Sequence, residues 1–115
     1  MRLGALRARA TIQATGDAEE AAVLEPLLSQ YINEGYDRLA EAFGLKECEM
    51  LQTEEDEPVL PAWAHGAIAD YASWMLMRNG NAQRQSRGLQ FRAAFEEARA
   101  RALRAGRSRF TGIYP

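Results

Sequence analysis

The residues of this chain that could do chemistry are few. The sequence contains one cysteine, Cys48, and one histidine, His65. A thiolate beside an imidazole is a minimal nucleophile and base, but the residues around Cys48 form no nucleophile motif. A single histidine also leaves no histidine pair for a metal site and only one member of a conventional hydrolytic triad. The sequence therefore predicts no catalytic residue at either position.

Four consecutive acidic residues, Glu54–Glu57, are the other candidate for chemistry. Clustered carboxylates attract cations, but this run lacks the alternating ligand spacing of an EF-hand. It is expected to lie in an exposed loop, where carboxylate pKa values have little reason to shift. No phosphate-binding glycine loop occurs elsewhere. We therefore expect no metal, no cofactor and no enzymatic activity.

The charged residues are sorted along the chain. Residues 17–57 contain 13 of the 16 acidic side chains and only two basic ones, whereas residues 58–115 contain nine arginines and three acidic residues. A small domain with one acidic and one basic surface can attract copies of itself head to tail, which is the type of contact that closes into rings. The alternative is that each helix carries its own solvated charges, without a partner.

Length and composition set further limits. A chain of 115 residues is large enough for one domain with its own core, and one cysteine allows no internal disulfide. The first ten residues carry three arginines and no apolar region of a signal peptide. The longest apolar segment, Trp63–Met77, is interrupted by His65 and Asp70, so no membrane span is predicted. We expect a soluble intracellular protein.

The first half of the chain has the pattern of helices. Residues 1–10 are expected to form a short amphipathic turn or helix, ordered against the core or a partner. The capping box of Asp17 and Glu20 predicts a helix from near Ala18. Pro26 is expected to interrupt this helix and to open a fresh one after a short kink.

A segment without helical period separates this first long helix from the second. Gly44 is a natural end for the first helix. Residues 46–61 follow, and here Cys48 and Met50 alternate with acidic residues. The segment is therefore predicted to be an acidic loop or a short β element.

Pro61 opens the strongest predicted helix, and Asn79-Gly80 ends it. Its core-facing stripe is expected to contain Ala64, Ala67, Ile68, Tyr71, Ala72 and Met75. The last helix is predicted from Ala82 to Ala105, with an inner face of Leu89, Phe91, Phe95, Ala98 and Ala102. The fold class is thus all-α, a bundle of three to four helices in a single domain of residues 1–105, with an extended C-terminal arm of residues 106–115.

The second long helix carries another stripe, which runs through Trp63, Ala67, Asp70, Trp74 and Met77 at helical spacing. Tryptophan and methionine are enriched at interfaces, which favours a partner surface. The alternative is a helix that is buried on two sides. Together with the arginine-rich last helix and the arm, the expected subunit or partner interface consists of Trp63, Asp70, Trp74, Met77, Arg101, Arg104, Arg107, Arg109, Phe110 and Tyr114.

The order of these elements resembles that of the head–tail connector (adaptor) proteins of long-tailed bacteriophages. The resemblance covers most of the chain and is carried by MRLGALRAR at residues 1–9, YINEGY at 31–36, LPAWAHGAIADYA at 60–72, and Gly80-Asn-Ala followed by Phe91 and Phe95. It implies a helical subunit of a dodecameric ring in the virion neck, assembled in the bacterial cytoplasm. Expected partners are other copies of the chain, a portal protein, and a tail or stopper protein. Packaged DNA would pass through the channel without sequence-specific binding, and no membrane is involved.

Two other functions remain open at this point. The arginine-rich last helix would suit a small nucleic-acid-binding regulator, although the net charge of −2 is unusual for such a protein. A tail-completion protein would differ from a connector only in its position in the particle.

Overall fold

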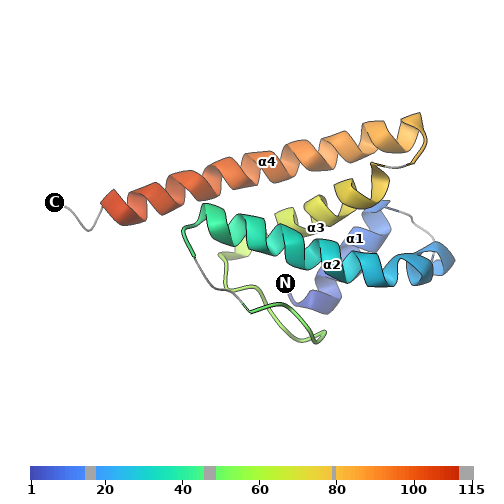
Figure 1. Ribbon diagram of the computed structural model, residues 1–115, viewed down its shortest axis with the longest axis horizontal. Coiled ribbons are helices and arrows are strands. Elements are labelled where there is room, and N and C mark those ends of the chain that lie inside the picture. Colours follow the sequence, from blue (N-terminus) through green and yellow to red (C-terminus); the bar gives the residue numbers. More distant parts are fainter. Residues whose placement is uncertain (15–17, 46–48, 79, 112–115) are drawn as a thin grey trace.

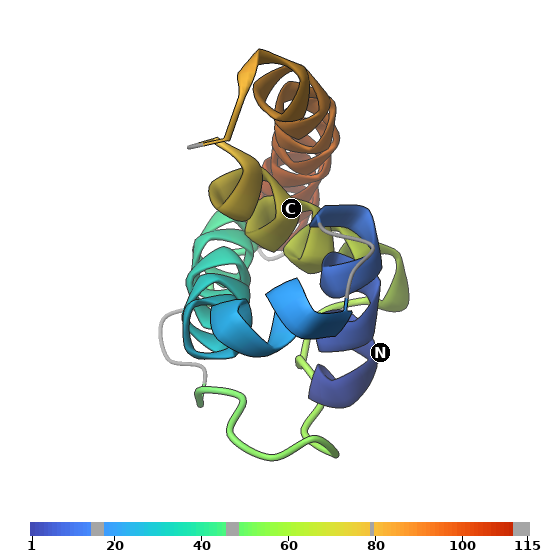
Figure 2. The same cartoon turned by 90° about the vertical axis from the view of Figure 1, so that its right-hand side faces the viewer.

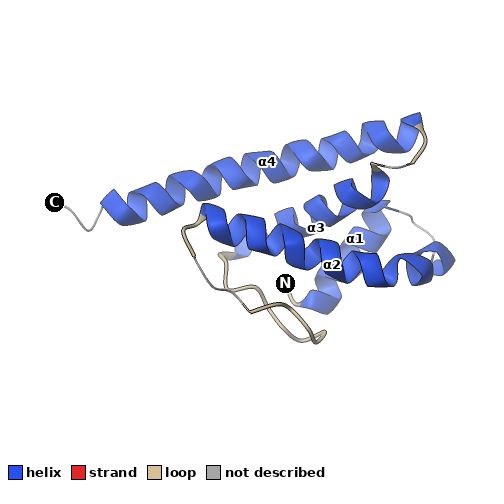
Figure 3. Cartoon of the chain, viewed as in Figure 1, coloured by secondary structure: helices blue, strands red, loops and turns tan. Residues whose placement is uncertain are grey.

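In the residues that the structure describes, the protein is an all-α bundle of four helices, as the sequence predicts (Figures 1 and 3). The computed structural model describes residues 1–14, 18–45, 49–78 and 80–111, with only the backbone described for 18–25 and 107–111. The helices are α1 (Leu3–Ala14), α2 (Ala18–Ala42), α3 (Ala62–Met77) and α4 (Ala82–Thr111). Residues 3–10 are therefore part of a helix that continues to Ala14, and the burial of Leu3, Leu6 and Ala10 holds it against the core.

Helix α3 lies at the centre and contacts all three other helices (Figure 2). Its predicted core stripe is confirmed, since Ala64, Ala67, Ile68, Tyr71, Ala72 and Met75 are all buried. Pro61 occupies the position before its first turn, where a missing N–H costs nothing. The small side chains on this helix let its neighbours pack close to its axis.

Helix α2 is continuous through Pro26, so the predicted break at that residue is wrong. A proline inside a helix removes one hydrogen bond and costs about 3 kcal/mol. Burial of Leu28, Ile32 and Leu39 farther along α2 offsets this cost. The N-terminal part of α2 turns away from the axis of the rest, as expected near a proline (Figure 2). Asp17 of the predicted capping box lies outside the described residues.

Helix α2 ends as predicted at Gly44, which has a φ of 84°. The Gly44 N–H donates to the Glu41 carbonyl at 2.9 Å and the Leu45 N–H to the Ala40 carbonyl at 2.9 Å. This pair of bonds is the Schellman motif, in which glycine supplies the left-handed conformation.

The segment from Glu49 to Pro61 is a loop, and none of the residues described there is in a strand. Its backbone pairs with helices instead of a neighbouring strand. The N–H groups of Leu3 and Gly4, in the first turn of α1, donate to the carbonyls of Asp56 and Glu54 at 2.8 and 3.0 Å. The β alternative is therefore wrong for these residues, while Cys48 lies outside the described part of the chain.

Helix α4 is longer than predicted and continues past Ala105 to Thr111. The low helix propensity of glycine predicts a helix end at Gly106. In the structure, its missing side chain instead leaves room for the backbone of α2. A Cβ atom at this position would lie 3.1 Å from the Ala42 carbonyl oxygen and 3.2 Å from that of Phe43. The glycine thus lets α4 pass closely over the end of α2. Residues 106–111 of the predicted arm are helical, and 112–115 lie outside the described residues.

The inner face of α4 is confirmed in part. Phe95 and Ala102 are buried and Phe91 and Ala98 half-buried, whereas Leu89 is 54% exposed. Gly88 takes the inward position that was assigned to Leu89, and a Cβ there would lie 3.2 Å from the Met77 Cβ. Gly88, and not Leu89, therefore lies inward where α4 passes Met77.

Candidate interaction surfaces

The two tryptophans of the stripe predicted as a partner surface lie against α4 of the same chain. The Arg101 guanidinium lies 3.9 Å from the Trp63 ring centroid, and the Arg92 guanidinium lies 5.2 Å from that of Trp74. Met77 is fully buried and belongs to the core, which corrects its assignment to a surface. The structure thus favours the alternative of a helix buried on two sides, and a subunit contact through the half-buried tryptophans stays a prediction.

Asp70 lies on the side of α3 that faces α1, apart from the two tryptophans. Its Oδ1 accepts a hydrogen bond from Gln13 Nε2 at 3.2 Å, and Gln13 in turn accepts one from the buried Ser73 hydroxyl at 2.7 Å. Burial raises the pKa of Asp70, while the charge of Arg9 and the Gln13 hydrogen bond oppose this rise. These contacts join α1 to α3, so Asp70 supports the fold.

The remaining predicted interface residues lie on α4 or beyond it. Arg101 and Arg104 are exposed. The side chains of Arg107, Arg109 and Phe110, and the whole of Tyr114, lie outside what the structure describes, so their role stays a prediction.

His65 is buried, and both of its ring nitrogens have partners. Nε2 donates to the Leu60 carbonyl at 2.7 Å, and Nδ1 lies against the amino group of Met1. An imidazole held in this way positions the loop before α3 and the start of the chain. Among the described residues, no three His, Cys, Asp or Glu side chains are grouped so that they could hold a metal ion.

Tyr71 connects the core to a polar group on α2. Its hydroxyl accepts a hydrogen bond from Arg38 Nε at 3.2 Å and interacts with the Glu34 carboxylate. Arg38 also pairs with Glu34 at 3.5 Å. Burial is the main reason that the pKa of Tyr71 is raised to about 12, with Glu34 adding to the effect and Arg38 opposing it.

One phenol group is therefore expected to ionise near pH 12 in an ultraviolet absorbance titration of the folded protein. The unfolded value is about 10, so between these pH values only the native state holds the proton. The stability that this group contributes is complete below about pH 10 and is lost as the pH rises toward 12. The transition should be absent from Tyr71→Phe; its persistence there would assign it to another tyrosine.

The charge sorting of the sequence becomes a separation in space. Helix α4 runs along one edge of the molecule, and the loop from Glu49 to Pro61 lies on the opposite edge (Figures 1 and 2). Exposed arginines on α4 are Arg87, Arg92, Arg99, Arg101 and Arg104. Exposed carboxylates on α2 and the loop are Asp37, Glu41, Glu49, Glu54, Glu55 and Glu57. Even with the exposed Glu96 and Glu97 of α4, the exposed arginines give that edge of the molecule an excess of positive charge, and the opposite edge has an excess of negative charge.

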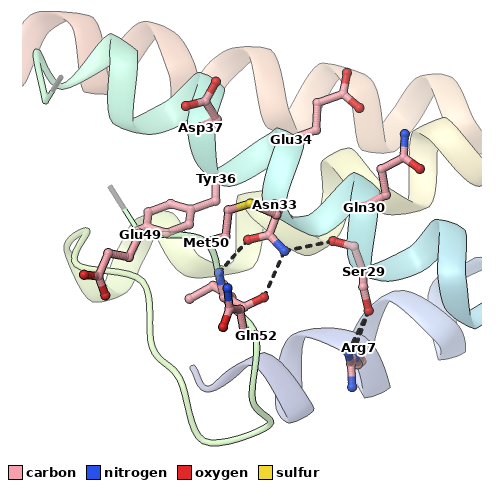
Figure 4. Close-up of a pocket in the computed structure, with 11 residues that line it drawn as sticks. Arg7, Ser29, Gln30, Asn33, Glu34, Tyr36, Asp37, Glu49, Met50 and Gln52 are labelled. Atoms are coloured by element: carbon pink, nitrogen blue, oxygen red, sulfur yellow. Dashed lines mark hydrogen bonds between the residues drawn. The ribbon is translucent and has the colours of Figure 1, made fainter. Parts of the chain in front are cut away.

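The acidic edge contains a cleft of about 570 Å³ (Figure 4). The middle of α2 forms one wall, and the first residues of the loop form the other, with Arg7 of α1 at one end. Tyr36 and Leu51 are buried, whereas Met50 is 65% exposed. The other residues that line the cleft are Ser29, Gln30, Asn33, Glu34, Asp37, Glu49 and Gln52. The cleft thus combines apolar surface with three carboxylates and one guanidinium.

Asn33 attaches the loop to α2. Its Oδ1 accepts from the Leu51 N–H at 2.7 Å, and its Nδ2 donates to the Leu51 carbonyl at 3.0 Å (Figure 4). One side chain thereby satisfies both backbone groups of Leu51, as a neighbouring strand would. Beside it, Arg7 donates from Nε and Nη2 to the Ser29 hydroxyl at 3.1 and 2.7 Å. These bonds hold the cleft walls in place.

The sequence patterns did not predict this cleft. Ser29, Asn33 and Tyr36 are separated by four and three residues, so they share one face of α2. This stripe of polar and aromatic residues, beside the apolar stripe of the same helix, is the sequence feature that could have indicated the cleft. The pairing of Asn33 with Leu51 leaves no such pattern, because a backbone partner can be any residue.

Comparisons of this chain with protein-family models, with curated proteins and with solved structures found no match. The described helices include none with the length and apolar character needed to cross a bilayer.

Proposed function

We propose that this protein is a structural subunit that associates head to tail with copies of itself and forms a ring in the neck of a phage particle. The observation that carries this proposal is the placement of the basic α4 and the acidic loop on opposite edges of one small subunit. Opposed charges on two different surfaces favour a heterologous contact, and such contacts close into rings when the rotation between subunits permits. The size and place of the ring come from the resemblance of the sequence to head–tail connectors, which implies a dodecamer between portal and tail. Such a ring would extend the DNA channel and offer a docking surface to a tail or stopper protein.

The length of α4 supports this reading. A helix of 30 residues is about 45 Å long and runs along most of the 54 Å long axis of the molecule. Its C-terminal end projects beyond the other helices (Figure 1). Arginines along such a helix can reach a neighbouring subunit without disturbing the core.

A nucleic-acid-binding regulator is the second candidate, and the same exposed arginines on α4 favour it. Phosphate binding by a basic helix falls steeply with salt. The acidic opposite edge would weaken it, because DNA is repelled by that side of the subunit.

The test is the mass of the purified full chain by light scattering on a sizing column, at low and high salt, with and without short duplex DNA. We expect a large discrete oligomer that high salt weakens and DNA leaves unchanged. A monomer at all protein concentrations and salt conditions would contradict self-association through these edges. A DNA-dependent shift of the peak would favour the regulator instead.

A further inference from the structure

The cleft of Figure 4 is one part of a longer groove. A second hollow of about 310 Å³ shares Tyr36, Glu49, Met50 and Leu51 with it and continues to Val59. A third of about 520 Å³ begins at Val59 and reaches Phe43 and Leu45 at the end of α2. The three hollows therefore follow the acidic loop from Arg7 to the C-terminal end of α2.

Large apolar side chains in the groove are exposed to solvent, which is unfavourable unless a partner covers them. Met50 is 65% and Val59 71% exposed, and they are among the most exposed large hydrophobic residues in the described part of the chain. Exposed apolar residues gathered in a groove with a polar rim are typical of a protein-binding site. Methionine adapts its shape to different partners, which suits a docking surface.

The charges of the groove define what it can bind. Asp37, Glu49 and Glu57 line it and are exposed, and Arg7, the arginine among the described residues that line the cleft, is bonded to Ser29. An occupant that brings cations and an apolar or aromatic side chain would match both properties. An acidic peptide or a phosphate backbone would be repelled.

The C-terminal segment of the same chain has this chemistry. Residues 107–115, RSRFTGIYP, contain two arginines, a phenylalanine, an isoleucine and a tyrosine, and no acidic residue. Gly106 of α4 passes over the Ala42 and Phe43 carbonyls, beside one end of the groove, and the helix then continues to Thr111, past α2 and away from the rest of the groove of its own chain (Figure 1). A groove on a neighbouring copy is therefore the natural recipient.

We propose that residues 107–115 of one subunit bind in the acidic groove of the next, with arginines pairing with Asp37 and Glu49 and an aromatic ring contacting Met50. The proposal rests on the proposed head-to-tail association and names the segment and the surface that make it. In this arrangement the acidic loop of one subunit lies against the basic C-terminal segment of the next.

The first experiment measures binding of a fluorescent peptide of residues 105–115 by anisotropy. The receptor is the full chain with Arg107→Glu and Arg109→Glu, so that its own C-terminal segment does not compete. We expect Asp37→Lys with Glu49→Lys to weaken binding by about tenfold or more, since paired interface charges couple strongly. The matched control, Glu41→Lys with Glu55→Lys, changes the net charge equally at exposed positions outside the groove and should bind nearly as before. Equal binding by the groove variant and the control, or no binding at all, would overturn the proposal.

The second experiment mixes two full-length variants and follows their mass by sedimentation. The groove variant (Asp37→Lys, Glu49→Lys) and the tail variant (Arg107→Glu, Arg109→Glu) should each fail to assemble. An equal mixture should recover the wild-type mass, because each reversed surface then finds its opposite. Assembly of the groove variant alone would refute the docking site but leave the ring proposal intact. Peptide binding in the groove by a wild-type chain that never assembles would refute the ring and keep the site.

Discussion

Phe95→Ala is expected to lower the free energy of unfolding by about 3–5 kcal/mol, a large part of the stability of a domain of this size. Phe95 is 2% exposed, and its ring centroid lies 4.9 Å from that of Tyr71. In the described range 82–106 it is the only large side chain of α4 that is fully buried. Its loss removes both apolar contacts and the ring interaction and leaves a cavity between α3 and α4. Urea unfolding followed by far-ultraviolet circular dichroism measures the change.

Leu89→Ala is the matched control on the same helix. Leu89 has a side chain of similar apolar character but is 54% exposed, so its truncation should cost less than about 1 kcal/mol. The two substitutions separate the observed register of α4 from one in which both residues face inward, as the sequence pattern predicted. Similar losses for both would mean that α4 is rotated from the position described.

Local sequence patterns correctly predicted the features of the fold that depend on burial of apolar residues or on backbone conformation at a single position. The buried stripe of α3 follows from helical spacing of apolar residues, and the end of α2 at Gly44 follows from the conformational freedom of glycine. Both signals lie within a few residues of the feature that they predict. The all-α class and the central place of α3 were predictable for the same reason.

Local propensity failed where tertiary packing overrides it. Pro26 and Gly106 both indicate helix ends, yet the structure has a continuous helix through each. At Gly106 the reason is visible, because the carbonyls at the end of α2 leave no room for a side chain. Helix propensity is a weak predictor of where a helix ends, because contacts between residues distant in sequence can override it.

The stripe of Trp63 and Trp74 shows a different limit. Helical spacing correctly indicates that this face of α3 is covered, but it does not say by what. An arginine-rich helix of the same chain supplies the cover, through Arg92 and Arg101 stacked on the two indole rings. Similarly, the acidic groove is formed by α2 and the loop, which meet only in the fold, so no local pattern in the sequence predicts it.

Gly35→Ala is expected to destabilise the protein, although alanine is the better helix former. A Cβ atom at residue 35 would lie 2.9 Å from Cδ1 of the Tyr71 ring and 3.0 Å from its Cβ and Cγ. The Tyr71 ring cannot retreat, because it is buried against Phe95 and held through its hydroxyl by Arg38. Overpacking of this kind costs about 1–3 kcal/mol, which exceeds the gain of about 0.5–1 kcal/mol from replacing a helical glycine.

Gly66→Ala supplies the matched control, since it is the same substitution inside another helix of the same protein. A Cβ atom there would lie 2.8 Å from Nη1 of Arg9, the far end of an exposed and flexible side chain. Arg9 can move away at little cost, so the helix gain should remain and the variant should be as stable as the wild type or more stable by up to about 1 kcal/mol. Denaturant midpoints of the two variants should thus move in opposite directions from that of the wild type. If Gly35→Ala stabilised the protein as much as Gly66→Ala, the close contact of α2 with the Tyr71 ring would be disproved. The interactions of the Tyr71 hydroxyl with Glu34 and Arg38 would then also be in doubt, because the contact of the ring with Gly35 places this hydroxyl beside α2.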